Sequence, residues 1–79
     1  MTSLWCGNIP ATLEEWGVRE ELAAYGVRPY RIRLMRRRPG ADSYAILVFA
    51  SPQLAAAAMD RRVVWSNRGR ALFRYARPH

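Results

Sequence analysis

Aromatic and apolar side chains alternate along residues 42–49 in a way that suits binding of a flat ligand. One side of this extended segment would carry Tyr44, Ile46 and Val48, and the other would carry Ala45, Leu47 and Phe49. Because both sides are apolar, the strand is either buried on both sides or buries one side and offers the other to a ligand. In a short chain with a large positive charge, the second arrangement favours a flat, anionic ligand such as single-stranded nucleic acid.

Charge is polarised along the chain. The formal net charge of +7 comes from thirteen arginines and no lysine. Four of the six acidic residues lie within residues 14–21 beside a single Arg, so that segment is acidic and the rest of the chain is strongly basic. A basic surface attracts phosphate and accelerates association. Composition alone also permits the plainer interpretation that the arginines only solubilise the protein.

Length and composition exclude several classes of protein. The 79 residues suffice for one domain, residues 1–79, and a hydrophobic fraction of 51% argues against disorder. The lone Cys6 can form no internal disulfide, and the only histidine is His79, so we expect neither a metal nor a cofactor. No apolar run approaches the ~18 residues of a membrane span. We therefore expect a soluble, intracellular protein, nuclear or cytoplasmic, with no membrane contact.

The first half of the chain predicts a strand, a helix and a second strand. Residues 3–7 form the first strand, ended by Pro10. Thr12 and Glu15 fit a capping box that opens a helix, which Gly26 would stop near residue 25. The predicted buried stripe of this helix consists of Val18, Leu22 and Tyr25. Residues 30–35 form the second strand, with apolar side chains alternating with Arg31, Arg33 and Met35.

The second half predicts a strand, a helix and a last strand. Residues 44–50 pair with the second strand as a hairpin. Ser51 and Pro52 are typical of a helix start, and an Ala-rich helix follows to residue 60. A turn over residues 66–69 leads to a strand over residues 71–76. We expect its phase to place Phe73 and Tyr75 inward and Arg74 outward, although the opposite phase stays open because Leu72 is also apolar. The order predicts an α+β, ferredoxin-like βαββαβ fold: a four-stranded antiparallel sheet with two helices on one face.

Two short motifs in the first and third strands make the chain resemble the RNA-recognition motif (RRM) family over essentially its whole length. Residues 4–9, Leu-Trp-Cys-Gly-Asn-Ile, fit the shorter signature of that family. The longer signature is matched at Tyr44, Ala45, Leu47 and Phe49, whereas Asp42, Ser43 and Ile46 depart from it. Ile46 stands where the family usually has a stacking aromatic residue, and Asp42 stands where it has a basic residue, Lys or Arg.

The resemblance implies a non-catalytic module that binds single-stranded RNA on the sheet face opposite the helices. Trp5 would stack one base, Tyr44 would pack against sugars, and Ile46 would give contact without stacking. Arginines of the flanking strands and of the loop at residues 36–41 would contact phosphates. The expected RNA-binding residues are Trp5, Tyr44, Ile46, Arg31, Arg33, Arg74, Arg36, Arg37 and Arg38.

Three alternatives stay open at this point. The sheet or the acidic first helix could instead bind a peptide or protein partner, and an exposed Trp16 beside the four Glu residues would mark such a site. Single-stranded DNA is also possible, because nothing in the sequence reports on the 2′-hydroxyl. An enzyme on the same fold is disfavoured, because no histidine base, cysteine–base pair or acid pair stands out. In each case we expect a monomer.

Overall fold

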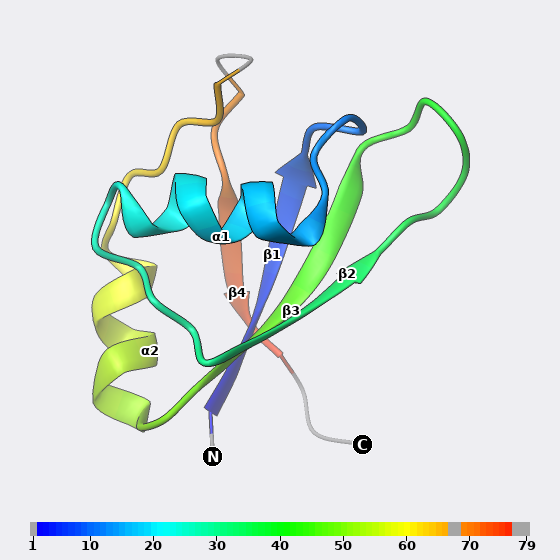
Figure 1. Ribbon diagram of the computed structural model, residues 1–79. Coiled ribbons are helices and arrows are strands. Elements are labelled where there is room, and N and C mark those ends of the chain that lie inside the picture. Colours follow the sequence, from blue (N-terminus) through cyan, green and yellow to red (C-terminus); the bar gives the residue numbers. More distant parts are fainter. Residues whose placement is uncertain (1, 67–68, 77–79) are drawn as a thin grey trace.

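The structure is a computed structural model that describes residues 2–66 and 69–76. Six elements follow the predicted order: β1 (Thr2–Ile9), α1 (Glu15–Ala23), β2 (Arg31–Met35), β3 (Ser43–Phe49), α2 (Pro52–Met59) and β4 (Leu72–Tyr75). The strands form one antiparallel sheet in the order β2-β3-β1-β4, and both helices lie on the same face of it (Figure 1). The predicted ferredoxin-like fold is thus confirmed. No helix in the described ranges is long and apolar enough to cross a membrane.

Successive side chains of each central strand point alternately into the core and onto the face without helices. Along β3, the buried residues Ser43, Ala45, Leu47 and Phe49 alternate with half-buried neighbours. The same alternation buries Leu4 and Cys6 of β1, which stand opposite Leu47 and Ala45 in the register. These side chains pack under α1 and α2 with Val18, Leu22 and Ala55. The helix-free face is left to Trp5, Tyr44, Ile46 and Val48.

The first strand runs further than the sequence predicts because a bulge carries it past Asn8. The register with β3 shifts between Cys6 and Ile9, and Asn8 has a φ of 63°. The Asn8 amide Nδ2 donates a 2.8 Å hydrogen bond to the carbonyl of Arg70, which ties the bulge to the segment before β4. The extra residue lets both Cys6 and Ile9 point into the core.

The predicted capping box on the first helix is wrong. The helix starts at Glu15 with Glu14 as N-cap, and no side chain caps it. The N–H of Leu13 instead donates to the carbonyl of Pro10 in a turn that contains Thr12, so the chain enters the helix later than expected. Pro52 and Ser51 behave as predicted, since the Ser51 hydroxyl accepts the N–H of Leu54 at 3.2 Å.

The end of α1 also differs from the sequence prediction. Val27 and Gly26 donate to the carbonyls of Leu22 and Ala23, which is the Schellman pattern, and Gly26 has the left-handed φ of 79° that this pattern requires. Because the helix ends before Tyr25, that side chain leaves the predicted buried stripe and is 37% exposed. Val27 is buried in the core instead.

At the β4 edge of the sheet, the register shows the phase expected for the last strand, but not the expected burial of Tyr75. Phe73 packs against the core, and Arg74 stands opposite Trp5 on the open face, as expected. Tyr75 stands opposite the buried Leu4, on the expected side of the strand, but β4 is an edge strand and 55% of the Tyr75 side chain is exposed. Asn67 and Arg68 of the predicted turn lie outside the described residues, as does His79.

Candidate nucleic-acid interface

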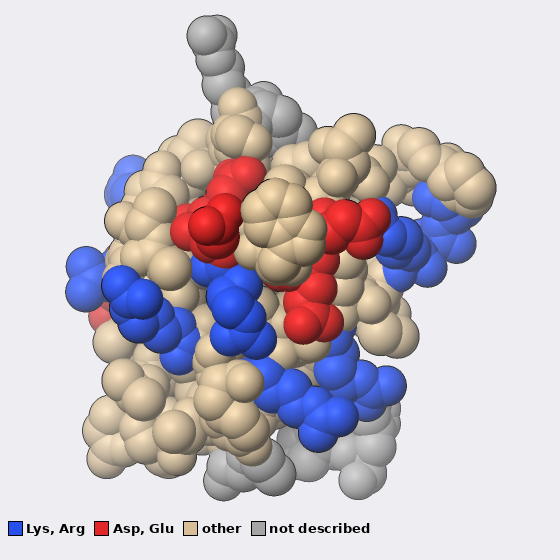
Figure 2. Space-filling model, viewed as in Figure 1, with Lys and Arg blue, Asp and Glu red and all other residues tan. Residues whose placement is uncertain are grey.

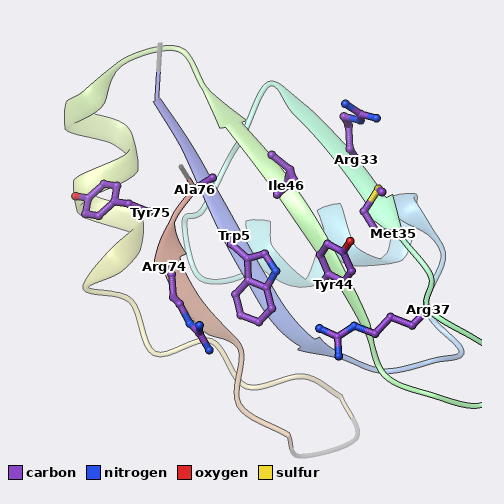
Figure 3. A pocket seen from close by; sticks show the side chains of 9 residues that line it. All are labelled: Trp5, Arg33, Met35, Arg37, Tyr44, Ile46, Arg74, Tyr75 and Ala76. Atoms are coloured by element: carbon purple, nitrogen blue, oxygen red, sulfur yellow. The ribbon is translucent and has the colours of Figure 1, made fainter. Parts of the chain in front are cut away.

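The two aromatic side chains of the open face lie together at its centre. Trp5 of β1 stands opposite Ile46 of β3 in the register, which makes Tyr44 its diagonal neighbour. The two ring centroids are 6.1 Å apart and the ring planes differ by 25°. Two nearly parallel π-surfaces therefore lie side by side on the helix-free face of the sheet (Figure 3).

A glycine on the same strand allows the indole of Trp5 to lie flat on the sheet. A Cβ placed on Gly7 would sit 2.1 Å from Cη2 of Trp5 and 2.5 Å from its Cζ3, distances that real side chains do not tolerate. One face of the indole thus covers the backbone at Gly7. The sequence analysis assigned no role to Gly7, although a glycine inside a strand is a known sign of close approach.

Guanidinium groups cover the outer surface of both rings. The Cζ of Arg74, from β4, lies 4.8 Å from the centroid of Trp5. The Cζ of Arg37, from the loop after β2, lies 5.1 Å from the centroid of Tyr44. Both distances are within the range of attractive cation–π contacts. The rings and the cations form one surface that combines stacking with positive charge.

This surface is the floor of an open groove of about 850 Å³. Its lining includes six of the nine predicted RNA-binding residues: Trp5, Arg33, Arg37, Tyr44, Ile46 and Arg74. Sequence reasoning missed three further lining residues, Met35, Tyr75 and Ala76. Met35 could have been found, because it shares the side of β2 that carries Arg31 and Arg33 and stands opposite Tyr44.

The other three predicted residues do not line the groove. Arg31 lies two residues before Arg33 on β2, opposite Val48, and borders a second hollow at the outer edge of the sheet. Arg38 lies in the exposed loop after β2, where it borders a small hollow together with Arg37. Arg36 turns away from the groove altogether.

Arg36 ties the loop after β2 to the segment between β1 and α1. Its guanidinium donates to the carbonyls of Ala11 and Leu13, each at 2.7 Å, and to the Ser43 hydroxyl at 3.4 Å. It also forms an ion pair of 3.3 Å with Glu14. The guanidinium of Arg36 is thus occupied by contacts within the protein, whereas the guanidinium of Arg37, one residue further along, lies over Tyr44 in the groove.

Two remaining side chains behave as packing residues. Cys6 is fully buried, and desolvation raises the pKa of its thiol to about 12, so the thiol is protonated at neutral pH. Trp65 is 1% exposed, and its Nε1 has no hydrogen-bond partner among the described residues. Trp16 is the opposite case, with 69% of its surface exposed on α1.

No protein-family model, curated protein or solved structure matches this chain.

Proposed function

We propose that the protein is a single-stranded RNA-binding domain of the RNA-recognition type, and that its groove on the open sheet face is the binding surface. The observation that carries this proposal is the pair of neighbouring rings, Trp5 and Tyr44, on the face without helices. A ring on an open sheet is a stacking platform for any base, worth about 1–3 kcal/mol per base. Arg33, Arg37 and Arg74 supply positive charge around it.

Binding would exchange one set of contacts for another. In the free protein, Arg74 and Arg37 lie over the two rings. A base that stacks on Trp5 takes the place of the Arg74 guanidinium or stacks on top of it, and the planar guanidinium can do either because it stacks and also binds phosphate in a bidentate manner. Ile46 adds apolar contact beside the rings but no π-surface. We therefore expect one main stacking position at Trp5, with sugar contacts at Tyr44.

The role we propose is non-catalytic, and its setting is intracellular. The groove lining presents guanidinium, phenol, indole and thioether groups together with aliphatic side chains. A general acid–base mechanism needs a carboxyl, imidazole or thiol near the reacting atoms, and none of the residues that line the groove carries one. Single-stranded DNA would use the same stacking and phosphate contacts, so RNA and DNA oligonucleotides of equal sequence belong in the same titration.

The direct test is Trp5→Ala, with Trp16→Ala as its matched control. Both change a tryptophan to alanine, but Trp16 lies on a helix on the other side of the sheet. We expect Trp5→Ala to weaken binding of a short pyrimidine RNA by about 1–3 kcal/mol in a fluorescence titration at dilute protein. Trp16→Ala should bind RNA as the wild type does. If a folded Trp5→Ala variant keeps full affinity, the open face is not the RNA site.

Salt dependence provides a second test that needs no mutation. With about three to five phosphate contacts, the slope of log K against log salt should be about −2 to −3.5 for a single strand. The three groove arginines account for the lower number of phosphate contacts, and contacts from Arg31 and Arg38, beside the groove, would account for the higher number. An affinity that stays flat as salt rises would argue for the rival function, a protein-binding domain. The exposed Trp16 is the one observation that favours this rival.

A further inference from the structure

The outer side of α1 carries an exposed tryptophan between acidic side chains. Trp16 is 69% exposed, more than any other large hydrophobic side chain among the described residues. Glu15 precedes it, and Glu20 lies one helical turn further on the same side of the helix. Figure 2 shows the acidic side chains gathered over α1, with basic side chains around them. We call Glu15, Trp16 and Glu20 the α1 patch.

The carboxylates of the α1 patch are free to meet a partner. Glu14 pairs with Arg36, and Glu21 accepts the N–H and the hydroxyl of Ser66 at 2.7 and 2.9 Å. In contrast, neither Glu15 nor Glu20 has an ion pair or hydrogen bond with any described residue outside the backbone of the helix. The patch therefore presents an aromatic ring flanked by two unpaired negative charges.

The groove on the opposite side of the sheet presents the complementary set. Arg33, Arg37 and Arg74 form no ion pair with a described residue, and two of them rest on aromatic rings. The α1 patch and the groove lie on opposite sides of the same sheet, so one molecule cannot bring its own patch to its own groove (Figures 1 and 3). Two copies can.

We propose that the α1 patch of one copy docks in the groove of a second copy, with Trp16 between the groove rings and arginines and with Glu15 and Glu20 facing the guanidinium groups. A ring flanked by anions combines a π-surface with negative charge, as a base flanked by phosphates does, so the patch acts as a nucleotide mimic. The groove, at about 850 Å³, is roomy enough for an indole ring. Arg–Trp contacts of this kind are cation–π interactions.

The geometry of this contact determines how the protein assembles. The two surfaces differ, so the contact is heterologous and head-to-tail, and it adds copies in an open series unless the rotation closes. One helix side and one groove make a small interface, which places the contact among weak, transient associations with a Kd of about 10 µM to 1 mM. A monomer at low concentration and short chains at high concentration are the expected states. Bound RNA would compete for the groove, a consequence that rests on the proposed function.

The experiment is sedimentation velocity of the wild-type protein over a concentration series at two ionic strengths. At about 10 mM salt, where charges act over ~30 Å, we expect the sedimentation coefficient to rise with concentration. At about 1 M salt, where they act over ~3 Å, we expect a monomer throughout. Trp16→Ala should raise the Kd of association at least about tenfold. The matched control is Leu54→Ala, an exposed apolar residue on α2 outside both surfaces, which should associate as the wild type does.

Mixing two variants tests the head-to-tail geometry. Trp16→Ala removes the ring of the patch, and Arg74→Glu reverses a groove charge; both positions are exposed, so the fold should survive. Each variant alone should stay monomeric, whereas an equimolar mixture should form a 1:1 dimer, because Trp16→Ala keeps its groove and Arg74→Glu keeps its patch. A wild type that stays monomeric at low salt up to about 1 mM protein would overturn the proposal, as would a mixture no more associated than its components.

Adding RNA separates this proposal from the function. If RNA dissolves the assemblies at the concentration at which it binds, both the proposed RNA-binding function and the docking between copies are supported. If the protein associates in the patch-dependent way but binds no RNA, the proposed function fails and the docking stands. If it binds RNA but Trp16→Ala associates as the wild type does, only the docking fails.

Discussion

The two sides of β3 are about equally apolar, yet the structure uses them for different purposes. Ala45, Leu47 and Phe49 are at most 1% exposed under the helices. Tyr44, Ile46 and Val48 alternate with them and remain half-buried on a side that no helix covers. The difference shows that hydrophobic side chains on a strand do not by themselves mean burial; what lies on each side decides whether a residue belongs to the core or to a binding surface.

Stability should separate the two sides most clearly. Leu47→Ala removes a fully buried side chain and should lower the free energy of unfolding by about 2–5 kcal/mol. Ile46→Ala, one residue away on the open face, should cost about 1 kcal/mol or less, because its surroundings can relax into solvent. Urea denaturation of both variants measures the difference. Equal losses would mean that something covers the open face as firmly as the helices cover the other.

RNA affinity should depend instead on the open side of β3. Ile46→Phe adds a π-surface beside Trp5 and should tighten binding of a short pyrimidine RNA by about 1–3 kcal/mol. Val48→Phe is its control, because Val48 shares the strand and the side but does not line the groove. Asp42→Lys should add only a smaller, salt-dependent gain, since Asp42 is exposed before β3 and outside the groove lining. Titrations that show the same gain from Val48→Phe would place the stacking site elsewhere.

The flat position of Trp5 can be disturbed without removing its ring. Gly7→Ala forces the indole away from the backbone and should weaken RNA binding by about 1–2 kcal/mol, a loss we expect to be smaller than that of Trp5→Ala. The near-ultraviolet circular dichroism of the tryptophan should change with it. In a Trp5→Ala background, Gly7→Ala should have no further effect on affinity, because no ring remains to displace. Additive losses from the two changes would show that Gly7 acts through something other than Trp5.

The smallest contrast lies between two adjacent arginines. Arg36→Ala breaks the contacts with Ala11, Leu13 and Glu14 and should lower the free energy of unfolding by about 1–2 kcal/mol. Arg37→Ala should change stability by less than about 0.5 kcal/mol and instead weaken RNA binding by about 0.5–1 kcal/mol. Thermal unfolding and RNA titration of both variants give the comparison. Arg36→Ala with normal stability and weak RNA binding would mean that its guanidinium leaves those carbonyls when RNA binds.

Periodicity explains why much of the fold could be read from the sequence. The alternation in β3 and the Ser51–Pro52 start of α2 were both correct, because each depends on neighbouring residues only. The errors fell at element ends. Thr12 does not cap α1, since its segment is held in a turn and by Arg36, and Tyr25 is exposed because the helix stops before it. Such ends are settled by contacts with distant segments.

The candidate site divides in the same way. Trp5, Tyr44, Ile46 and Arg74 were placed correctly because a strand directs side chains alternately to its two sides. Nothing local distinguished Arg36 from Arg37, since a loop has no such period. The exposure of Trp16 was equally undetermined, because a tryptophan in a short helix is compatible with packing or with solvent.

The sequence by itself determined the order of the elements and which side chains share a side of each strand, since these follow from the geometry of the extended chain. Tertiary structure decided which side the helices cover, and it alone brought Trp5 beside Tyr44, its indole over Gly7 and the guanidinium of Arg74 over that ring. The reason is register. Residues far apart in the chain meet only once β1 has paired with β3 and β4, and the bulge at Asn8 and the bonds of Arg36 are part of what fixes those pairings and the loops around them.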